Sequence, residues 1–313
     1  MNTKSIFANL VRSEDGAYST AYGPFVLQSA LQPIFRQYSE EMIDIVAFEG
    51  LVRASRDGMA FPASQFFPLV AAEDLAGLDS LLRTLHILNT GRLNRTRAKI
   101  FVKFHPGLLV TPEAMRQELE HIRLAAHEAG LGTDRVVCEI TAKDDIAATL
   151  ALRFADTIRG TGFLIAMNEY GAQDNDIALM QALRPDYVKF DSRWVRDFMH
   201  NSAGFALLKV IVRQFVDEAI VPIFEGLEDA DQLALCRDLD VPLVQGYVLA
   251  RPELAPTSFN DRFPEMLLPP APARPHNERP LFGAVERPSQ EPMLAGLPLR
   301  GRSAPVFGRR TAR

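Results

Sequence analysis

The feature that most constrains the fold of this chain is a regular alternation of two kinds of segment between residues 25 and 253. Short runs rich in β-branched and aromatic residues, bounded by Gly, Pro or Asp, are typical of buried strands. They lie at 26–35, 43–52, 98–104, 135–141, 162–168, 186–190, 219–224 and 243–247. The stretches between them have helical periodicity and lie at 73–92, 112–129, 144–158, 174–183, 203–217 and 229–239. This alternation predicts parallel strands joined by crossover helices.

Eight strand-like runs favour a closed (β/α)8 TIM-like barrel over an open sheet, and the Gly-rich fingerprint of a dinucleotide-binding sheet is absent. The length of 313 residues, 47% of them hydrophobic, accommodates such a barrel as one domain. We expect a lead-in of weak helical character at 1–24, the barrel domain at 25–253, and a tail at 254–313. Residues 252–313 hold 12 of the 21 prolines, so we expect this Pro/Arg-rich tail to be disordered.

Composition excludes several classes of protein. The two cysteines, Cys138 and Cys236, stand in apolar runs, which predicts buried thiols and no disulfide or metal site. The net charge of −5 disfavours a specific nucleic-acid scaffold. The chain has no run of about 18 apolar residues and no secretory signal pattern, so we expect no transmembrane segment and a cytoplasmic location.

Polar residues close seven of the strand-like runs: Glu49, Lys103, Glu139, Asn168 with Glu169, Lys189, Glu225 and Gln245. In a β/α barrel the functional groups sit at the carboxyl ends of the strands, so these side chains should converge. Converging acids repel one another unless cations lie among them. A divalent-cation site would fit the acids, but a lysine and an asparagine are mixed in among them. The pattern is therefore compatible with two kinds of protein, an enzyme and a binding protein that has lost its catalytic activity.

The motifs that carry these residues, in this order, resemble the EAL-domain family, the cyclic di-GMP phosphodiesterases and their degenerate relatives. They are QPIF (32–35), FEGLVR (48–53), KFHP (103–106), CEIT (138–141), NEYG (168–171), VKFD (188–191), FEGLED (224–229) and QGYVLARP (245–252). The resemblance implies a modified (β/α)8 barrel of the EAL type that binds cyclic di-GMP over its carboxyl-terminal rim. Active members hydrolyse cyclic di-GMP to pGpG with two Mg²⁺ or Mn²⁺ ions.

The resemblance also implies roles for individual residues. The metal-ligand positions of the family fall on Glu49, Glu139, Asn168 and Glu169. Its catalytic positions fall on Lys189 and Glu225, and its ligand contacts fall on Gln32, Arg53 and Gln245. Gly50 replaces the alanine of the family signature, which we take as a mild change that leaves Glu49 in place.

Three departures from the family pattern bear on the metal site. Lys103 stands where the family has a metal-binding asparagine, Asn168 and Glu169 replace paired aspartates, and the loop at 172–176 lacks the usual Thr-Gly. An ammonium has no lone pair for a metal. At 4 Å from a cation it would be repelled by about 4 kcal/mol at an effective dielectric constant of 20. Lys103 is therefore predicted to serve as an internal counter-ion among Glu49 and Glu139, although it could also turn away and leave one weak metal site.

These departures predict a degenerate EAL-domain signalling protein, impaired in catalysis, that acts as a cyclic di-GMP receptor or a protein-interaction module. An active metal-dependent phosphodiesterase and a nucleotide-free regulatory scaffold remain as alternatives. No cofactor is expected in the degenerate case, and Mg²⁺ or Mn²⁺ in the active one. The expected partners are cyclic di-GMP, an unidentified protein and, in a homodimer, a second copy of the chain.

Overall fold

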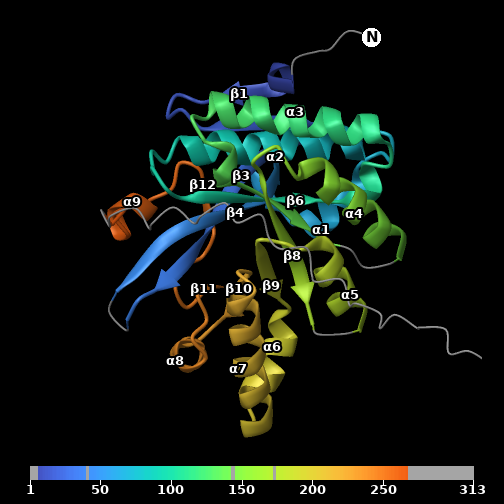
Figure 1. Ribbon diagram of the computed structural model, residues 1–313. Coiled ribbons are helices and arrows are strands. Elements are labelled where there is room, and N and C mark those ends of the chain that lie inside the picture. Colours follow the sequence, from blue (N-terminus) through green and yellow to red (C-terminus); the bar gives the residue numbers. More distant parts are fainter. Residues whose placement is uncertain (1–5, 40–41, 142–144, 172–173, 267–313) are drawn as a thin grey trace, which may run out of the picture. The chain divides into compact units, whose positions relative to one another are not determined.

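The computed structural model describes residues 6–39, 42–141, 145–171 and 174–266 (Figure 1). Most of the expected tail, 267–313, and part of the loop at 172–176 lie outside the described residues. Within the described part of the chain, no helix is both long and apolar enough to cross a membrane.

Eight strands close into a barrel, which confirms the predicted fold class. They are β3 (Phe25–Gln37), β4 (Ile43–Arg56), β6 (Lys99–Phe104), β7 (Val136–Ile140), β8 (Leu164–Tyr170), β9 (Tyr187–Phe190), β10 (Val221–Leu227) and β11 (Leu243–Gly246). The barrel closes because β3 pairs with both β4 and β11. Each barrel strand therefore has a neighbour on either side.

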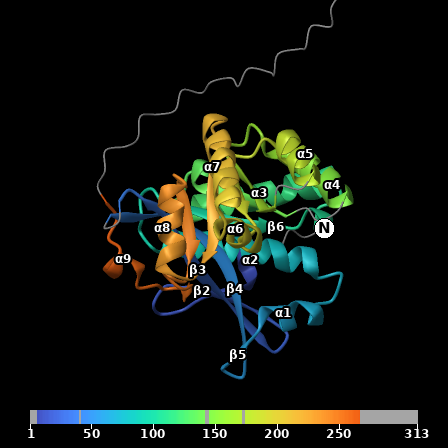
Figure 2. The ribbon, with the colours of Figure 1, turned by 90° about the horizontal axis from the view of Figure 1, so that it is seen from below.

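The expectation that all barrel strands are parallel is wrong for β3, which is antiparallel to both β4 and β11. The other neighbours in the barrel are parallel. The physical reason is the short connection at 38–42, since a parallel crossover needs a dozen or more residues. The β3–β4 ribbon continues beyond the barrel, where β4 also pairs with β5 (Met59–Phe61) (Figure 2).

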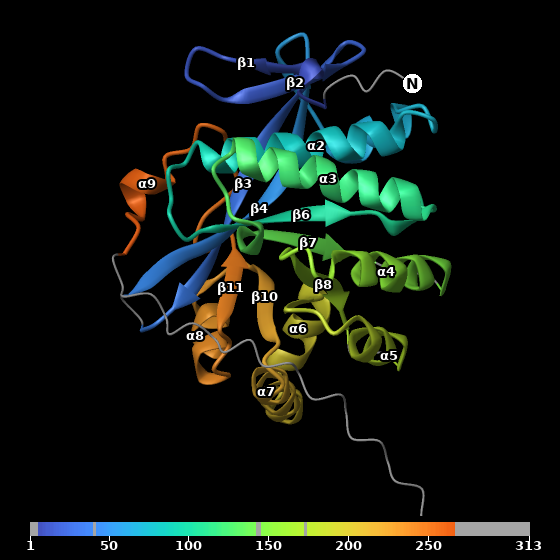
Figure 3. The same cartoon turned by 45° about the horizontal axis from the view of Figure 1, so that its top comes forward.

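Helices surround the strands (Figure 3). They are α1 (Ala63–Phe66), α2 (Leu75–Gly91), α3 (Pro112–Glu128), α4 (Asp145–Ile158), α5 (Asp174–Leu183), α6 (Ser192–Met199), α7 (Ser202–Asp217) and α8 (Ala230–Asp238). Short 3-10 turns lie at η1 (Ile6–Asn9), η2 (Phe67–Leu69), η3 (Pro106–Leu108) and η4 (Thr133–Arg135). Helix α3 begins as its sequence indicates, because Thr111 accepts a hydrogen bond from the amide of Ala114 and Pro112 stands at the first position.

The lead-in forms strands and not a weak helix. Strands β1 (Leu10–Arg12) and β2 (Tyr18–Tyr22) make an antiparallel hairpin, and β2 pairs with β3. The buried amide of Asn89 on α2 accepts from the backbone N–H of Tyr18 and donates to its carbonyl, at 2.8 and 3.0 Å. These tertiary partners satisfy the backbone, so they outweigh the local propensity of the segment.

The first residues of the expected tail are folded against the barrel. Strand β12 (Glu253–Leu254) pairs with β3, and α9 (Phe259–Arg262) follows it. Arg95 donates to the side chain of Asn260 at 2.9 Å, and Phe259 is fully buried. The ordered chain therefore continues past residue 254, where the tail was expected to begin.

Candidate functional site

The interior of the barrel determines where the polar strand ends point. One apolar cluster fills it with Ile34, Ala47, Phe101, Val137, Ala166, Ile223 and Leu243, one from each of seven barrel strands. Side chains two positions apart on a strand share a face. Six polar residues follow members of this cluster by two positions and so face the mouth of the barrel: Glu49, Lys103, Glu139, Asn168, Glu225 and Gln245.

Lys189 is the centre of the site. Its ammonium lies 2.8 Å from Oε2 of Glu225, 2.9 Å from Oε2 of Glu49 and 3.4 Å from Oε2 of Glu139. Lys189 is 1% exposed and Glu139 is completely buried. Three carboxylates from three strands thus share one buried ammonium.

Lys103 supplies a second cation from β6. Its ammonium lies 2.9 Å from Oε1 of Glu49, while Lys189 and the amide nitrogen of Gln245 both contact Oε2 at 2.9 Å. Each oxygen of Glu49 therefore has a cationic partner. We call Glu49, Lys103, Glu139, Lys189 and Glu225, together with Gln245, the lysine–glutamate cluster.

Burial and charge shift the pKa values within the lysine–glutamate cluster in opposite directions. Burial alone would raise the pKa of Glu49, but the attraction of Lys189 and Lys103 outweighs it and holds that pKa well below its usual range. For Glu139, burial and the nearby acids prevail over the lysines and raise the pKa to about 7. Burial opposes the charged form of Lys189, yet its three carboxylate partners raise its pKa well above the ordinary value.

The two residues of β8 behave differently from the lysine–glutamate cluster. The ladder with β9 is irregular between Met167 and Tyr170, and Glu169 adopts a left-handed φ of 57°. Glu169 is exposed. Asn168 donates to Oγ1 of Thr141 at 3.2 Å, and its Oδ1 is buried without a hydrogen-bond partner among the described residues. The bulge therefore separates the orientations of Asn168 and Glu169.

The predicted ligand contacts lie along the β3–β4 ribbon. Gln32 pairs in register with Glu49, and Arg53 pairs with Gln28 further out. Arg53 is exposed, and its guanidinium donates to the carbonyl of Val52 at 3.0 Å. Gln32 therefore lies beside the lysine–glutamate cluster, whereas Arg53 lies four residues from Glu49 along the same strand.

In the lysine–glutamate cluster, ammonium groups lie among the carboxylates that a two-metal centre would need. Such a centre needs carboxylates that bridge and hold two cations. Here both carboxylate oxygens of Glu49 contact ammonium groups, which repel a metal ion at close range. In the part of the chain that the structure describes, no three His, Cys, Asp or Glu side chains are grouped so that they could hold a metal.

Sequence reasoning missed His86. This residue lies on α2, is 5% exposed, and shares a hydrogen bond of 2.8 Å between its Nδ1 and Oγ of Ser29. A Cβ at Gly50 would lie 2.5 Å from Cγ of His86. Gly50 is therefore a steric requirement of this histidine and not a neutral replacement for alanine. The only sign of this contact in the sequence was Gly50, next to Glu49. A glycine can indicate a close approach, but it does not identify His86 as the neighbouring residue.

Sequence reasoning also missed the support beneath Lys103. Arg83, buried on α2, donates to the carbonyl of Lys103 at 3.1 Å and to Glu118 at 2.7 Å, and it pairs with Asp79. Burial opposes ionisation of Glu118, but Arg83 prevails and lowers its pKa to about 2. This ion network fixes the end of β6, from which Lys103 reaches Glu49.

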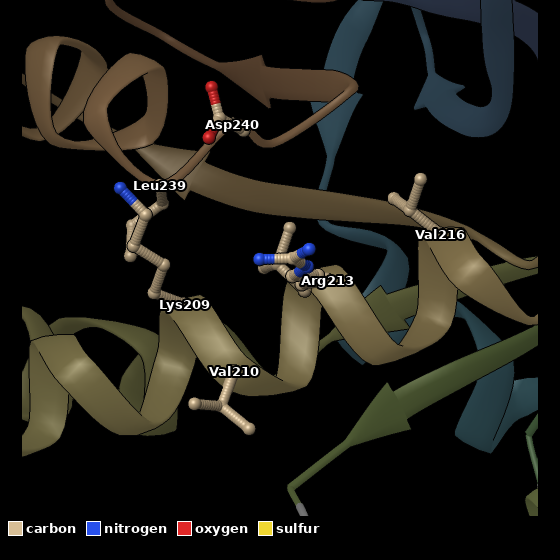
Figure 4. Close-up of a pocket in the computed structure, with 7 residues that line it drawn as sticks. Lys209, Val210, Arg213, Val216, Leu239 and Asp240 are labelled. Atoms are coloured by element: carbon tan, nitrogen blue, oxygen red, sulfur yellow. The ribbon is translucent and has the colours of Figure 1, made fainter.

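A pocket of about 420 Å³ lies outside the barrel (Figure 4). It is formed by α7 and the chain after α8 and is lined by Lys209, Val210, Val212, Arg213, Val216, Leu239 and Asp240. None of these residues belongs to the lysine–glutamate cluster. The pocket is therefore separate from the site at the barrel mouth.

The fold and the site define a β/α-barrel protein with a charged mouth at the carboxyl ends of its strands. A family model described as EAL domain matches residues 26–252. The chain therefore belongs to the EAL domain family.

Curated relatives are larger proteins. The probable cyclic di-GMP phosphodiesterase PdeA of Escherichia coli K12 is 24% identical over 229 residues, which are 71% of this chain and 30% of PdeA. The cyclic di-GMP phosphodiesterase NbdA of Pseudomonas aeruginosa is 25% identical over 136 residues, 43% of this chain and 17% of NbdA. This chain thus spans less than a third of the length of these relatives.

Solved structures share the fold. Klebsiella pneumoniae BlrP1, in a complex with calcium and cyclic di-GMP, gives a TM-score of 0.63 at 26% identity, over 74% of this chain and 56% of BlrP1. A standalone EAL protein of Vibrio cholerae O395, bound to cyclic di-GMP, gives 0.63 at 23% identity, over 74% of this chain and 94% of that one. The second likeness concerns the fold alone.

Proposed function

We propose that this chain is a degenerate EAL domain, impaired in cyclic di-GMP hydrolysis, that acts in signalling as a cyclic di-GMP receptor or a protein-interaction module. The observation that supports the proposal is that each carboxylate oxygen of Glu49 is paired with a lysine ammonium. Lys103 lies 2.9 Å from one of its oxygens and Lys189 lies 2.9 Å from the other. The signature carboxylate is thus held by protein cations.

Impaired catalysis follows from the cost of admitting metal ions. A divalent cation at Glu49 would have to displace Lys103 and then remain near a buried Lys189. Like charges at such distances repel strongly where burial reduces screening by water. Asn168 cannot replace a bridging carboxylate, because its amide offers one neutral oxygen.

Retained ligand binding needs less than hydrolysis. The side chain of Lys103 is 43% exposed and Arg53 is exposed, so a phosphate can approach both side chains. Gln32 stands opposite Glu49 and offers an amide at the same mouth. BlrP1, similar to this chain in fold and sequence, is described in a complex with cyclic di-GMP.

A second candidate function is an active phosphodiesterase with altered metal preference. Glu49, Glu139 and Glu225 all lie within 3.4 Å of Lys189, so the carboxylates of an active site remain together. Two buried amide oxygens, Oδ1 of Asn168 and Oε1 of Gln245, accept no hydrogen bond from any described residue. Such oxygens are available to a cation or to a donor group of a ligand.

The test is calorimetric titration of the purified chain with cyclic di-GMP, with and without Mg²⁺ or Mn²⁺, while chromatography follows pGpG. The proposed receptor binds cyclic di-GMP without metal and forms no product, and Arg53→Ala weakens binding. Metal-dependent production of pGpG that Glu49→Ala abolishes would refute impaired catalysis. If cyclic di-GMP does not bind under any of these conditions, the receptor role fails and the protein-interaction role remains.

A further inference from the structure

An exposed aromatic residue at the mouth of the barrel has a cation behind it. Tyr247 follows Gln245 of the lysine–glutamate cluster by two residues and is 52% exposed. The guanidinium carbon of Arg251 lies 4.4 Å from the centroid of its ring. One face of the tyrosine is therefore covered by a cation, and the ring still presents a large apolar surface to solvent.

The turn that carries Tyr247 and Arg251 is held at two points on β3. Before the turn, Val244 of β11 pairs with Phe35, and after it Glu253 of β12 pairs with Leu31. Gln32 lies between these two points on β3 and is opposite Glu49. The aromatic residue and its cation are thus anchored beside the lysine–glutamate cluster.

The backbone of the turn is also fixed against β10. The amide of Val248 donates to the carbonyl of Leu227 at 3.2 Å, and that of Ala250 donates to Gly246 at 3.1 Å. A Cβ at Gly246 would lie 2.2 Å from the carbonyl oxygen of Leu227, so the two strands meet too closely for a side chain. A ring mounted on such a turn loses little conformational freedom when a ligand covers it.

We propose that Tyr247, backed by Arg251, is a stacking platform for a purine base of the nucleotide ligand. The inference rests on the proposed function, because it extends the same nucleotide site. Planar bases stack on aromatic rings and on guanidinium groups. Lys103 and Arg53, on the neighbouring strands of the same mouth, supply positive charge for the phosphates. Stacking depends on the π-face that every base has. The platform should therefore favour purine nucleotides over sugar phosphates, but it should not distinguish guanine from adenine.

The first experiment measures cyclic di-GMP affinity of the intact chain by calorimetry. Tyr247→Ala should weaken binding about 10-fold or more, whereas Tyr247→Phe should retain it. Tyr247→Leu, which keeps an apolar side chain without a π-face, should behave like the alanine variant. Tyr38→Ala, at the exposed turn between β3 and β4, is the matched control and should leave the affinity unchanged. Equal affinity of the wild type and Tyr247→Ala overturns the platform and leaves the receptor proposal intact.

The second experiment uses Tyr247→Trp as a fluorescent probe in a Trp194→Phe background, since Trp194 is the single tryptophan of the chain. Cyclic di-GMP, cyclic di-AMP and GMP should quench its emission, and ribose 5-phosphate should not. If other purine nucleotides quench the emission and cyclic di-GMP does not, the platform is supported and cyclic di-GMP is refuted as its ligand. No quenching by any of these nucleotides overturns the platform.

Discussion

The ammonium of Lys103 lies 2.9 Å from Oε1 of Glu49, across the pair of strands β6 and β4. The contact places a protein cation where the family resemblance implies a metal ligand. Burial opposes the charged form of Lys103, but Glu49 and Glu139 outweigh this and raise its pKa. The ion pair is therefore self-reinforcing, since each charge favours ionisation of the other.

Removing the lysine and restoring the aspartates should increase metal affinity. We expect the triple variant Lys103→Asn, Asn168→Asp and Glu169→Asp to bind Mn²⁺ more tightly than the wild type, because an oxygen ligand replaces a repelling cation. Calorimetric titration with MnCl₂ measures the change. The double variant that retains Lys103 is the control and should gain less. Unchanged affinity in the triple variant would mean that these residues do not border the metal position.

Removing the central ammonium should destabilise the fold. Lys189→Met leaves three carboxylates without their shared partner, and breaking a buried ion pair costs about 3–5 kcal/mol. Urea denaturation measures the loss. Arg213→Met, on the exposed surface of α7, is the control and should change the free energy of unfolding by no more than about 0.5 kcal/mol, because its ion pair with Asp217 is exposed. Adding Glu139→Gln to Lys189→Met should recover part of the loss, and a further loss would contradict the charge argument.

The pH dependence of stability should reveal the raised pKa of Glu139. Its pKa is about 7 in the folded state against an ordinary value of 4.5, so the folded state binds the extra proton between these values. Stability from this group is therefore lost as pH rises from about 4.5 through about 7. The Glu139→Gln variant lacks this titrating group and should not lose stability in this way. The difference in free energy of unfolding, variant minus wild type, should therefore increase as pH rises from about 4.5 to about 7. Parallel pH profiles of the two proteins would contradict the assignment.

The contact between Gly50 and His86 predicts non-additive substitutions. Gly50→Ala should destabilise the protein by about 1–3 kcal/mol, because the new methyl meets the imidazole. His86→Ala clears that space, so the double variant should be more stable than the sum of the single effects by about 0.5–3 kcal/mol. Gly77→Ala is the matched control in α2, where a Cβ would meet nothing within 4 Å. Helix propensity predicts a gain of about 0.5–1 kcal/mol there. Strict additivity at positions 50 and 86 would show that the imidazole can move aside.

Most of the barrel could be predicted from local pattern, since each buried strand and amphipathic helix leaves its own periodicity. The direction of β3 was missed because periodicity records burial and not strand direction. The hairpin at β1 and β2 was missed although β2 pairs with the adjacent β3, because the hydrogen bonds that Asn89 makes to Tyr18 come from 71 positions away in the chain. The tail beyond 266 stays an expectation.

The polar residues of the barrel mouth could be predicted from the sequence. Residues two positions apart on a strand point to the same side, so the polar residue two positions after an inward-facing apolar residue also points inward. Ala47 and Glu49 on β4, and Phe101 and Lys103 on β6, are examples. Which charges meet was decided only by the closed barrel. Lys189 reaches Glu49 across 140 positions of the chain, and Gln245 reaches it across 196. Coulomb attraction and burial act on distance in space, so the partners of each charge depend on the tertiary structure that brings the strand ends together.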